Sequence, residues 1–121
     1  MELIIADTNI ILYALKGLPQ IQPYLIYDFA VSDITIIECL GVKDIPNEVL
    51  QFRKEFLENI YNYPLTSAIK NIVIKLKQQY TLKIADAIIA ATAIHYDKTL
   101  LTADKDFKRI KELSYLLISI V

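Results

Sequence analysis

Short, continuous runs of aliphatic residues recur along this chain and constrain its fold more than any other feature. Leu3–Ala6 (LIIA), Phe29–Ser32 (FAVS) and Thr99–Thr102 (TLLT) show no alternation of apolar and polar residues. Runs of this length and composition predict strands that are buried on both faces, as in a parallel sheet. Two more strands are predicted at Tyr61–Leu65, whose proline favours a sheet edge, and at Leu116–Ile120.

Segments of helical character separate these runs. They are Thr8–Leu15, Thr35–Val42, Asn47–Ile60, Ser67–Tyr80, Ile84–Tyr96 and Asp104–Lys111. In two of them the apolar residues mark one face, with Val49, Phe52, Phe56 and Ile60 in the third helix and Ile69, Ile72, Val73, Leu76 and Tyr80 in the fourth. Strands that alternate with helices predict an α/β fold, in which a parallel sheet is covered by helices on both faces.

The totals agree with one compact domain spanning residues 1–121. Of these residues 55% are hydrophobic, and only 2 are glycine and 4 proline, which excludes a disordered chain. The one cysteine, Cys39, excludes an internal disulfide framework and fits a reducing compartment. The apolar N-terminus lacks a basic start and is interrupted by Asp7 and Asn9, so it is a poor signal peptide. We therefore expect a cytoplasmic protein without membrane association.

Four carboxylates are expected at one edge of the predicted sheet. Asp7 directly follows the first strand, Asp104 follows Thr99–Thr102 by two residues, and Glu38 follows the second strand by a few. Asp86 begins a helix that is otherwise almost wholly apolar. In open parallel sheets the ligands bind beyond the carboxyl ends of the strands, where the strand order reverses. These four side chains are therefore expected to converge there.

Each of these acids also has a purely structural explanation. Asp7 and Asp104 are suited to cap the N-termini of the helices that follow them. Glu38 lies three residues after Thr35, the spacing of a capping box. Asp86 lies in the first turn of its helix, where a negative charge complements the helix dipole. Their shared position, on apolar elements at one sheet edge, favours a common site over four independent caps.

A cluster of carboxylates is stable only if protons or cations offset the repulsion. Oxygen ligands favour Mg²⁺ or Mn²⁺, and one or two such ions suit phosphodiester hydrolysis. Zinc is disfavoured, because the one histidine, His95, lies near the far end of the Asp86 helix. No Ser–His or Cys–His arrangement is visible.

The basic residues near the acids are candidate contacts for a phosphate backbone. They are Lys83, Lys105, Lys108 and Arg109. The formal net charge of −1 gives no sign of nucleic-acid binding. If the four site acids are left out of the count, however, the chain has 13 basic residues and 10 acidic ones. An ordinary solvated face explains these cations equally well.

Four segments together resemble the PIN-domain nucleases, most closely the VapC-like toxins of toxin–antitoxin pairs. They are IIADTNIIL, VSDITIIECLG, ADAIIAATA and LLTADKDF, in this order along essentially the whole chain. The resemblance implies an α/β/α sandwich with a central five-stranded parallel sheet, similar to a Rossmann fold. It also implies a metal-dependent endoribonuclease that hydrolyses RNA phosphodiester bonds.

The same resemblance implies roles for individual residues and for partners. Catalysis and metal binding would fall to Asp7, Glu38, Asp86 and Asp104, with support from Asn9, Thr102 and Asp106. A homodimer and an antitoxin protein are implied as partners, besides RNA. Independently, the aromatic and aliphatic residues of Tyr24–Tyr27, with Tyr61 and Tyr63, favour an interface, although they also suit the core. We expect a dimer that uses the N-terminal helical region and the long helices.

Two other functions are compatible with the sequence. The first is a doubly wound phosphotransfer or phosphatase-like protein with Asp7 as phosphoacceptor, although Asn9 stands where such phosphatases usually have a second aspartate. The second is an inactive PIN-fold module that only binds partners. Intact acids at all four positions disfavour it.

Overall fold

A parallel sheet of five strands forms the centre of the molecule in the computed structural model, which describes residues 2–120. The strands are β1 (Leu3–Ala6), β2 (Asp28–Ser32), β3 (Tyr61–Tyr63), β4 (Leu100–Thr102) and β5 (Tyr115–Leu117). Their order across the sheet is β3-β2-β1-β4-β5, and every neighbouring pair is parallel. The strand order therefore reverses between β1 and β4, the place where ligands of such sheets bind.

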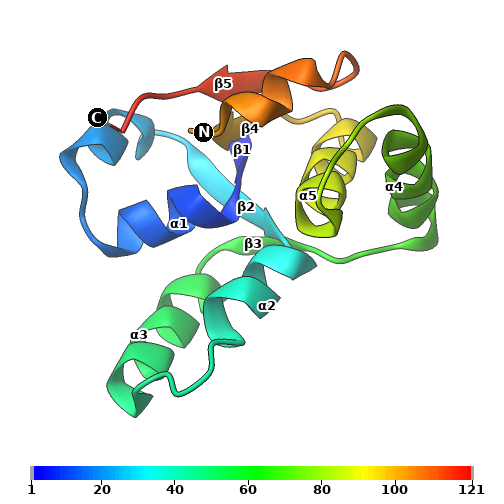
Figure 1. Cartoon of the computed structure of the whole chain (residues 1–121). Coiled ribbons are helices and arrows are strands. Elements are labelled where there is room, and N and C mark those ends of the chain that lie inside the picture. The colour runs from blue at the N-terminus through cyan, green and yellow to red at the C-terminus, as the bar shows by residue number, and fades with distance from the viewer. Residues whose placement is uncertain (1, 121) are drawn as a thin grey trace.

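Helices cover both faces of this sheet. The α-helices are α1 (Thr8–Leu15), α2 (Asp33–Leu40), α3 (Asn47–Glu58), α4 (Ser67–Gln79) and α5 (Ile84–His95), and two 3-10 helices are η1 (Pro19–Tyr24) and η2 (Lys105–Arg109). Figure 1 shows α4 and α5 together on one side and α1 on the other, with α2 and α3 extending beyond the end of the sheet. The predicted α/β/α sandwich with a five-stranded parallel sheet is confirmed.

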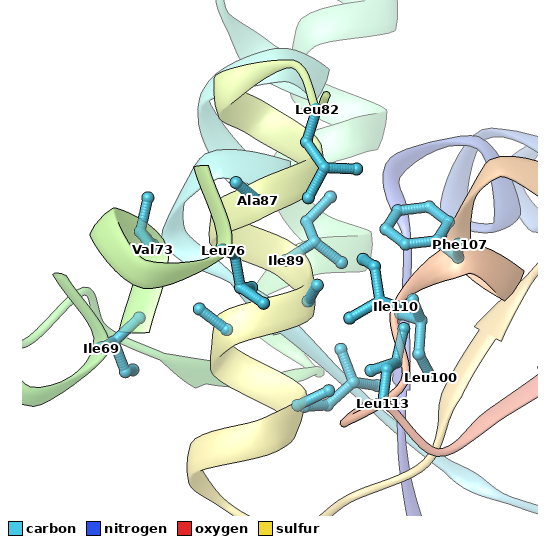
Figure 2. Close-up of a cluster of buried hydrophobic side chains, with 14 of the residues drawn as sticks. Ile69, Val73, Leu76, Leu82, Ala87, Ile89, Leu100, Phe107, Ile110 and Leu113 are labelled. Atoms are coloured by element: carbon cyan, nitrogen blue, oxygen red, sulfur yellow. The ribbon is translucent and has the colours of Figure 1, made fainter. Parts of the chain in front are cut away.

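The central strands are buried on both faces, as their continuous apolar sequences predict. Ile5 and Leu100 belong to the core between the sheet and α5, to which η2 also contributes (Figure 2). Their chain neighbours Ile4 and Leu101 belong to a second core beneath α1. Successive side chains of a strand point to opposite faces, so each central strand anchors both helical layers.

The predicted elements all occur, with shifted ends. The second helix begins at Asp33 rather than Thr35, and the helix predicted over Asp104–Lys111 is the shorter 3-10 helix η2. The last strand ends at Leu117 instead of Ile120. The 3-10 helix η1 is not predicted by the sequence, because Pro23 lies inside it and an internal proline disfavours a helix.

The predicted inward face of α3 is wrong in its first half. Val49 and Phe52 are 37% and 57% exposed, whereas Leu57 is buried and Phe56 is half-buried. The cause is the direction of the helix: its N-terminal half lies away from the sheet and only its C-terminal half returns to the core (Figure 1). Between residues 2 and 120 no helix has both the length and the apolar character needed to cross a membrane.

Candidate active site

The four predicted acids line one hollow. Asp7 is delivered by the end of β1, Glu38 by α2, Asp86 by the first turn of α5, and Asp104 by the segment after β4. The hollow is completed by Thr8, Asn9, Lys83, Ala85, Ile89 and Phe107. It lies at the carboxyl ends of β1 and β4, where the strand order reverses. Four elements that are distant in sequence therefore bring their carboxylates to one place.

Asp7 is the most deeply buried of these acids, with 4% of its surface exposed. One carboxylate oxygen, Oδ1, accepts a hydrogen bond of 2.9 Å from the backbone N–H of Ile10, which caps α1. The other accepts a hydrogen bond from the Thr102 hydroxyl. Burial, together with the smaller effects of the Asp104 and Asp86 charges, raises the pKa of Asp7 from 3.8 to about 6 despite these bonds. Asp7 is thus both a helix cap and an unusually basic carboxylate.

Thr102 connects two of the acids. Its fully buried hydroxyl donates to Asp7 and accepts the backbone N–H of Asp104 at 3.0 Å. Asp104 in turn accepts the backbone N–H of Asp106 at 2.9 Å and caps η2. The side chain of Asp106 is exposed and lines an adjoining hollow rather than this one.

Glu38 is held by a partner that sequence analysis missed. The Thr8 hydroxyl donates to Glu38 Oε1 at 2.6 Å and lies 3.1 Å from the Thr35 hydroxyl. The capping box that the spacing of Thr35 and Glu38 offered as an alternative does not form, because α2 begins at Asp33 with Ser32 as its N-cap, which places Thr35 inside the helix. Thr8 follows Asp7 directly, and its position beside the first acid is the one sequence signal that points to it.

Asp86 is half-buried, and desolvation raises its pKa, followed by the charge of Asp104. Lys83, one turn earlier, lowers it. Asp86 therefore shares the electrostatic environment of the other acids rather than being an isolated partner of the helix dipole.

The four candidate cations do not share one site. Lys83 lines the acidic hollow, and Lys83 and Arg109 both line a second hollow that adjoins it. Lys105 lines a different hollow, beside Tyr13 and Leu117. Lys108 is exposed on η2 and lines neither of the two adjoining hollows. Asn9 is exposed at the rim of the acidic hollow.

The donor set of the hollow fits a hard divalent cation. Its titratable groups are four carboxylates and one lysine, and neither the cysteine nor the histidine of the chain lines it. Within residues 2–120, no three potential ligands are already close enough to hold an ion. Burial is the main cause of the raised pKa of Asp7 and Asp86, and the neighbouring carboxylates also raise the pKa of both, a repulsion that a cation would offset.

The molecule is a doubly wound α/β/α protein. Its carboxylate-lined site lies beyond the central strands, where the strand order reverses. The PIN domain family matches residues 4–113, and the chain belongs to this family. A ribonuclease VapC of Rickettsia bellii is 32% identical, with 93% of this chain and 94% of the relative covered. Ribonuclease VapC1 of Rickettsia felis is 33% identical, with 96% of each chain covered.

Solved structures show the same architecture. One chain of a toxin–antitoxin complex from Klebsiella pneumoniae is 30% identical, with a TM-score of 0.78. The match covers 91% of this chain and 94% of that one. The structural similarity thus extends over nearly the whole fold, and residues 4–113, which the PIN domain family matches, include all four acids.

The stability of the metal-free protein is expected to rise as the pH falls from about 6 to about 4. Because burial raises the pKa of Asp7 from 3.8 to about 6, the folded protein binds a proton in this range that the unfolded chain does not. A difference of this size corresponds to at most roughly 3 kcal/mol in the free energy of unfolding. Urea unfolding in EDTA across this pH range, for wild type and Asp7→Asn, measures it. The increase in the free energy of unfolding between about pH 6 and about pH 4 should be larger in wild type than in Asp7→Asn. Identical pH dependences in the two proteins would show that the pKa of Asp7 is not raised by folding.

Asp86→Asn is expected to raise the melting temperature of the metal-free protein by a few degrees. Neutralisation removes the desolvation of the carboxylate and its repulsion by Asp104. The favourable interaction with the helix dipole is lost, but it is the smaller effect. Thermal melts at neutral pH in EDTA test this expectation. A melting temperature clearly below that of wild type would show that the charge of Asp86 stabilises the fold.

Proposed function

We propose that this chain is a divalent-metal-dependent endoribonuclease and the toxin of a toxin–antitoxin pair. The observation that carries the proposal is the convergence of four carboxylates, from four elements of a PIN domain, around one hollow. In this proposal Asp7, Glu38, Asp86 and Asp104 hold one or two Mg²⁺ or Mn²⁺ ions. Support comes from relatives named ribonuclease VapC at 32% and 33% identity over nearly the whole chain.

A bound divalent ion would supply a water of lowered pKa and would stabilise the charge that develops on the leaving oxygen. The protein's own part is to position the ligands. Thr102 orients Asp7 and the start of η2, and Thr8 orients Glu38. Such hydrogen bonds to ligand carboxylates fix their geometry, and removing one typically costs about 10–100-fold in metal affinity or activity. Asn9 at the rim and Asp106 in the adjoining hollow complete the proposed set of supporting residues.

The decisive experiment is cleavage of RNA by the purified protein, followed by gel electrophoresis of an end-labelled strand. Cleavage is expected with Mg²⁺ or Mn²⁺ and not in EDTA, and it should be lost in Asp104→Asn. Asp44→Asn is a matched control, because Asp44 is exposed, lies outside the hollow and has φ of 60°, which asparagine tolerates. Absence of metal-dependent cleavage in wild type would support the inactive PIN-fold interaction module instead.

We also propose an antitoxin protein as partner and the cytoplasm as location. The similarity to a chain of a toxin–antitoxin complex at 30% identity supports the partner. The lone cysteine fits a reducing compartment. Co-purification with the product of a neighbouring gene tests the partner.

A homodimer is expected in solution, formed through the N-terminal helical region and the long helices. Ile26 is 62% exposed, and Phe52 and Tyr61 are each 57% exposed, which leaves large apolar side chains in water. Tyr63, in contrast, is buried and contributes to the core. A closed two-fold assembly is the commonest way to cover such surfaces. Light scattering at micromolar concentration should give twice the monomer mass of 13.9 kDa. A monomer mass that does not change on concentration would refute the dimer.

A further inference from the structure

A second hollow adjoins the acidic one and shares three of its residues, Lys83, Asp86 and Asp104. Its other lining residues are Thr81, Leu82, Asp106 and Arg109. It therefore lies between η2 and the segment that leads into α5. A molecule that binds at the four acids and extends beyond them on this side therefore enters the second hollow.

Arg109 is held in place at the wall of this second hollow. Its Nη2 donates to the backbone carbonyl of Thr81 at 2.9 Å, and its Nε donates to the carbonyl of Asp106 at 3.3 Å. A guanidinium has five N–H donors, so three remain beyond these two bonds. Both acceptors are backbone carbonyls, so these two hydrogen bonds do not pair the charge of Arg109 with a carboxylate. An anchored guanidinium loses less conformational entropy when it binds a ligand than a free surface lysine does.

The lining of the second hollow suits a phosphate better than a base. None of its seven residues is aromatic, whereas nucleobases of single strands bind by stacking on aromatic rings. Phosphates bind to Arg and Lys, and Arg binds them with paired N–H donors. Lys83 lies at the junction of the two hollows, and Arg109 lies only in the second. From Lys83 to Arg109 the two cations thus mark a path away from Asp7 and Glu38, which line only the acidic hollow.

We propose that the second hollow binds a backbone phosphate that flanks the scissile phosphate of a single RNA strand, with Arg109 as the residue that binds it. The proposal rests on the proposed ribonuclease function and adds to it the course of the strand over the protein. Asp86, Asp104 and Asp106 also line the second hollow, so the strand is favoured only when cations offset those acids. Because the contact is to the backbone, Arg109 strengthens binding without selecting a sequence.

The test combines Arg109→Gln with substrates in which one phosphate at a time is a neutral methylphosphonate. In wild type, neutralising one phosphate beside the cleaved bond is expected to lower kcat/KM about tenfold, the typical effect of one charge-assisted hydrogen bond. Arg109→Gln is expected to lower kcat/KM by a similar factor, mainly through KM. With this variant the same methylphosphonate should cause no further loss, because the contact is already absent.

Lys111→Gln is the matched control. It removes the same charge just beyond η2, from an exposed residue that lines neither hollow. It should keep the wild-type response to every methylphosphonate. If Arg109 only ties η2 to the segment before α5, Arg109→Gln lowers the melting temperature and retains the full methylphosphonate effect. That result would overturn the proposal.

Binding gives a readout that does not depend on cleavage. In the Asp7→Asn background, fluorescence anisotropy with a labelled RNA strand and Mg²⁺ should show about tenfold weaker binding when Arg109→Gln is added, and the slope of log affinity against log salt should fall by about 0.7. Unchanged affinity and slope would reject the Arg109 contact, even if wild type cleaves RNA. Conversely, absence of cleavage by wild type with Mg²⁺ or Mn²⁺ would reject the ribonuclease function, while the affinity measurement still decides the Arg109 contact.

Discussion

Replacement of Asp7 by asparagine is expected to lower the rate of RNA cleavage by more than about a hundredfold. Residues that only support a metal ligand typically contribute about 10–100-fold to affinity or activity, and Asp7 is proposed as a ligand itself. The substitution removes a negative charge from the centre of the acidic hollow. Single-turnover cleavage at saturating Mg²⁺ and Mn²⁺ measures the loss. A wild-type rate in this variant would show that the metal assignment is wrong.

The fold of Asp7→Asn should persist, which separates this loss from unfolding. The amide oxygen can still accept the hydrogen bond from Ile10 N–H, and so α1 keeps its cap. The amide N–H₂ group faces the Thr102 hydroxyl, which has a lone pair to accept it. Because a buried charge is removed at the same time, the metal-free variant should be at least as stable as wild type at neutral pH. Circular dichroism and thermal melts in EDTA check this.

Phe107→Ala is expected to lower the free energy of unfolding by about 3–5 kcal/mol, the typical cost of deleting a buried phenylalanine ring. Phe107 is 2% exposed and packs from η2 into the core shared with α5 (Figure 2). Its ring also lines the acidic hollow. The total stability of a domain is about 5–15 kcal/mol, so this one change removes a large fraction. Urea unfolding of the metal-free protein measures it.

The same substitution should also reduce cleavage under conditions where the variant is still folded. Phe107 lies between Asp104 and Arg109, and its ring fixes the position of η2 against the core. Phe107→Leu is the matched control, since it keeps an apolar side chain and leaves a smaller cavity. It should retain most of the stability and activity. Equal losses in both variants would show that an apolar side chain at position 107 does not suffice to position η2 and that the aromatic ring itself is required.

The sequence predicted the central sheet and the convergence of the acids because both depend on local signals with few alternatives. A run such as Leu3–Ala6, apolar without interruption, is compatible with burial on both faces and little else. Once the strands are parallel, the residues that follow them share one edge. The sequence alone therefore predicts that Asp7 and Asp104 lie at one edge of the sheet, and both line the acidic hollow.

Other features depend on contacts that no local pattern specifies. The spacing of Thr35 and Glu38 matches a capping box, but Glu38 is bound by Thr8, 30 residues away. Periodicity identified an apolar face on α3, but it does not report whether anything lies opposite that face, and Phe52 is exposed. The anchoring of Arg109 by the carbonyl of Thr81 likewise links segments 28 residues apart.

The hydrogen bond from Thr102 to Asp7 joins residues 95 positions apart in a chain of 121. The adjacent strands β1 and β4 thus lie far apart in the sequence, and β4 is the neighbour of β1 that the ribosome makes last. During synthesis, β1 and β2 can pair early, whereas Thr102, which donates a hydrogen bond to Asp7, and Asp104 are made later. A nascent chain that has not reached these residues carries most of the helices without a complete acidic hollow. The order of synthesis therefore delays completion of the acidic hollow until Asp104 has been made.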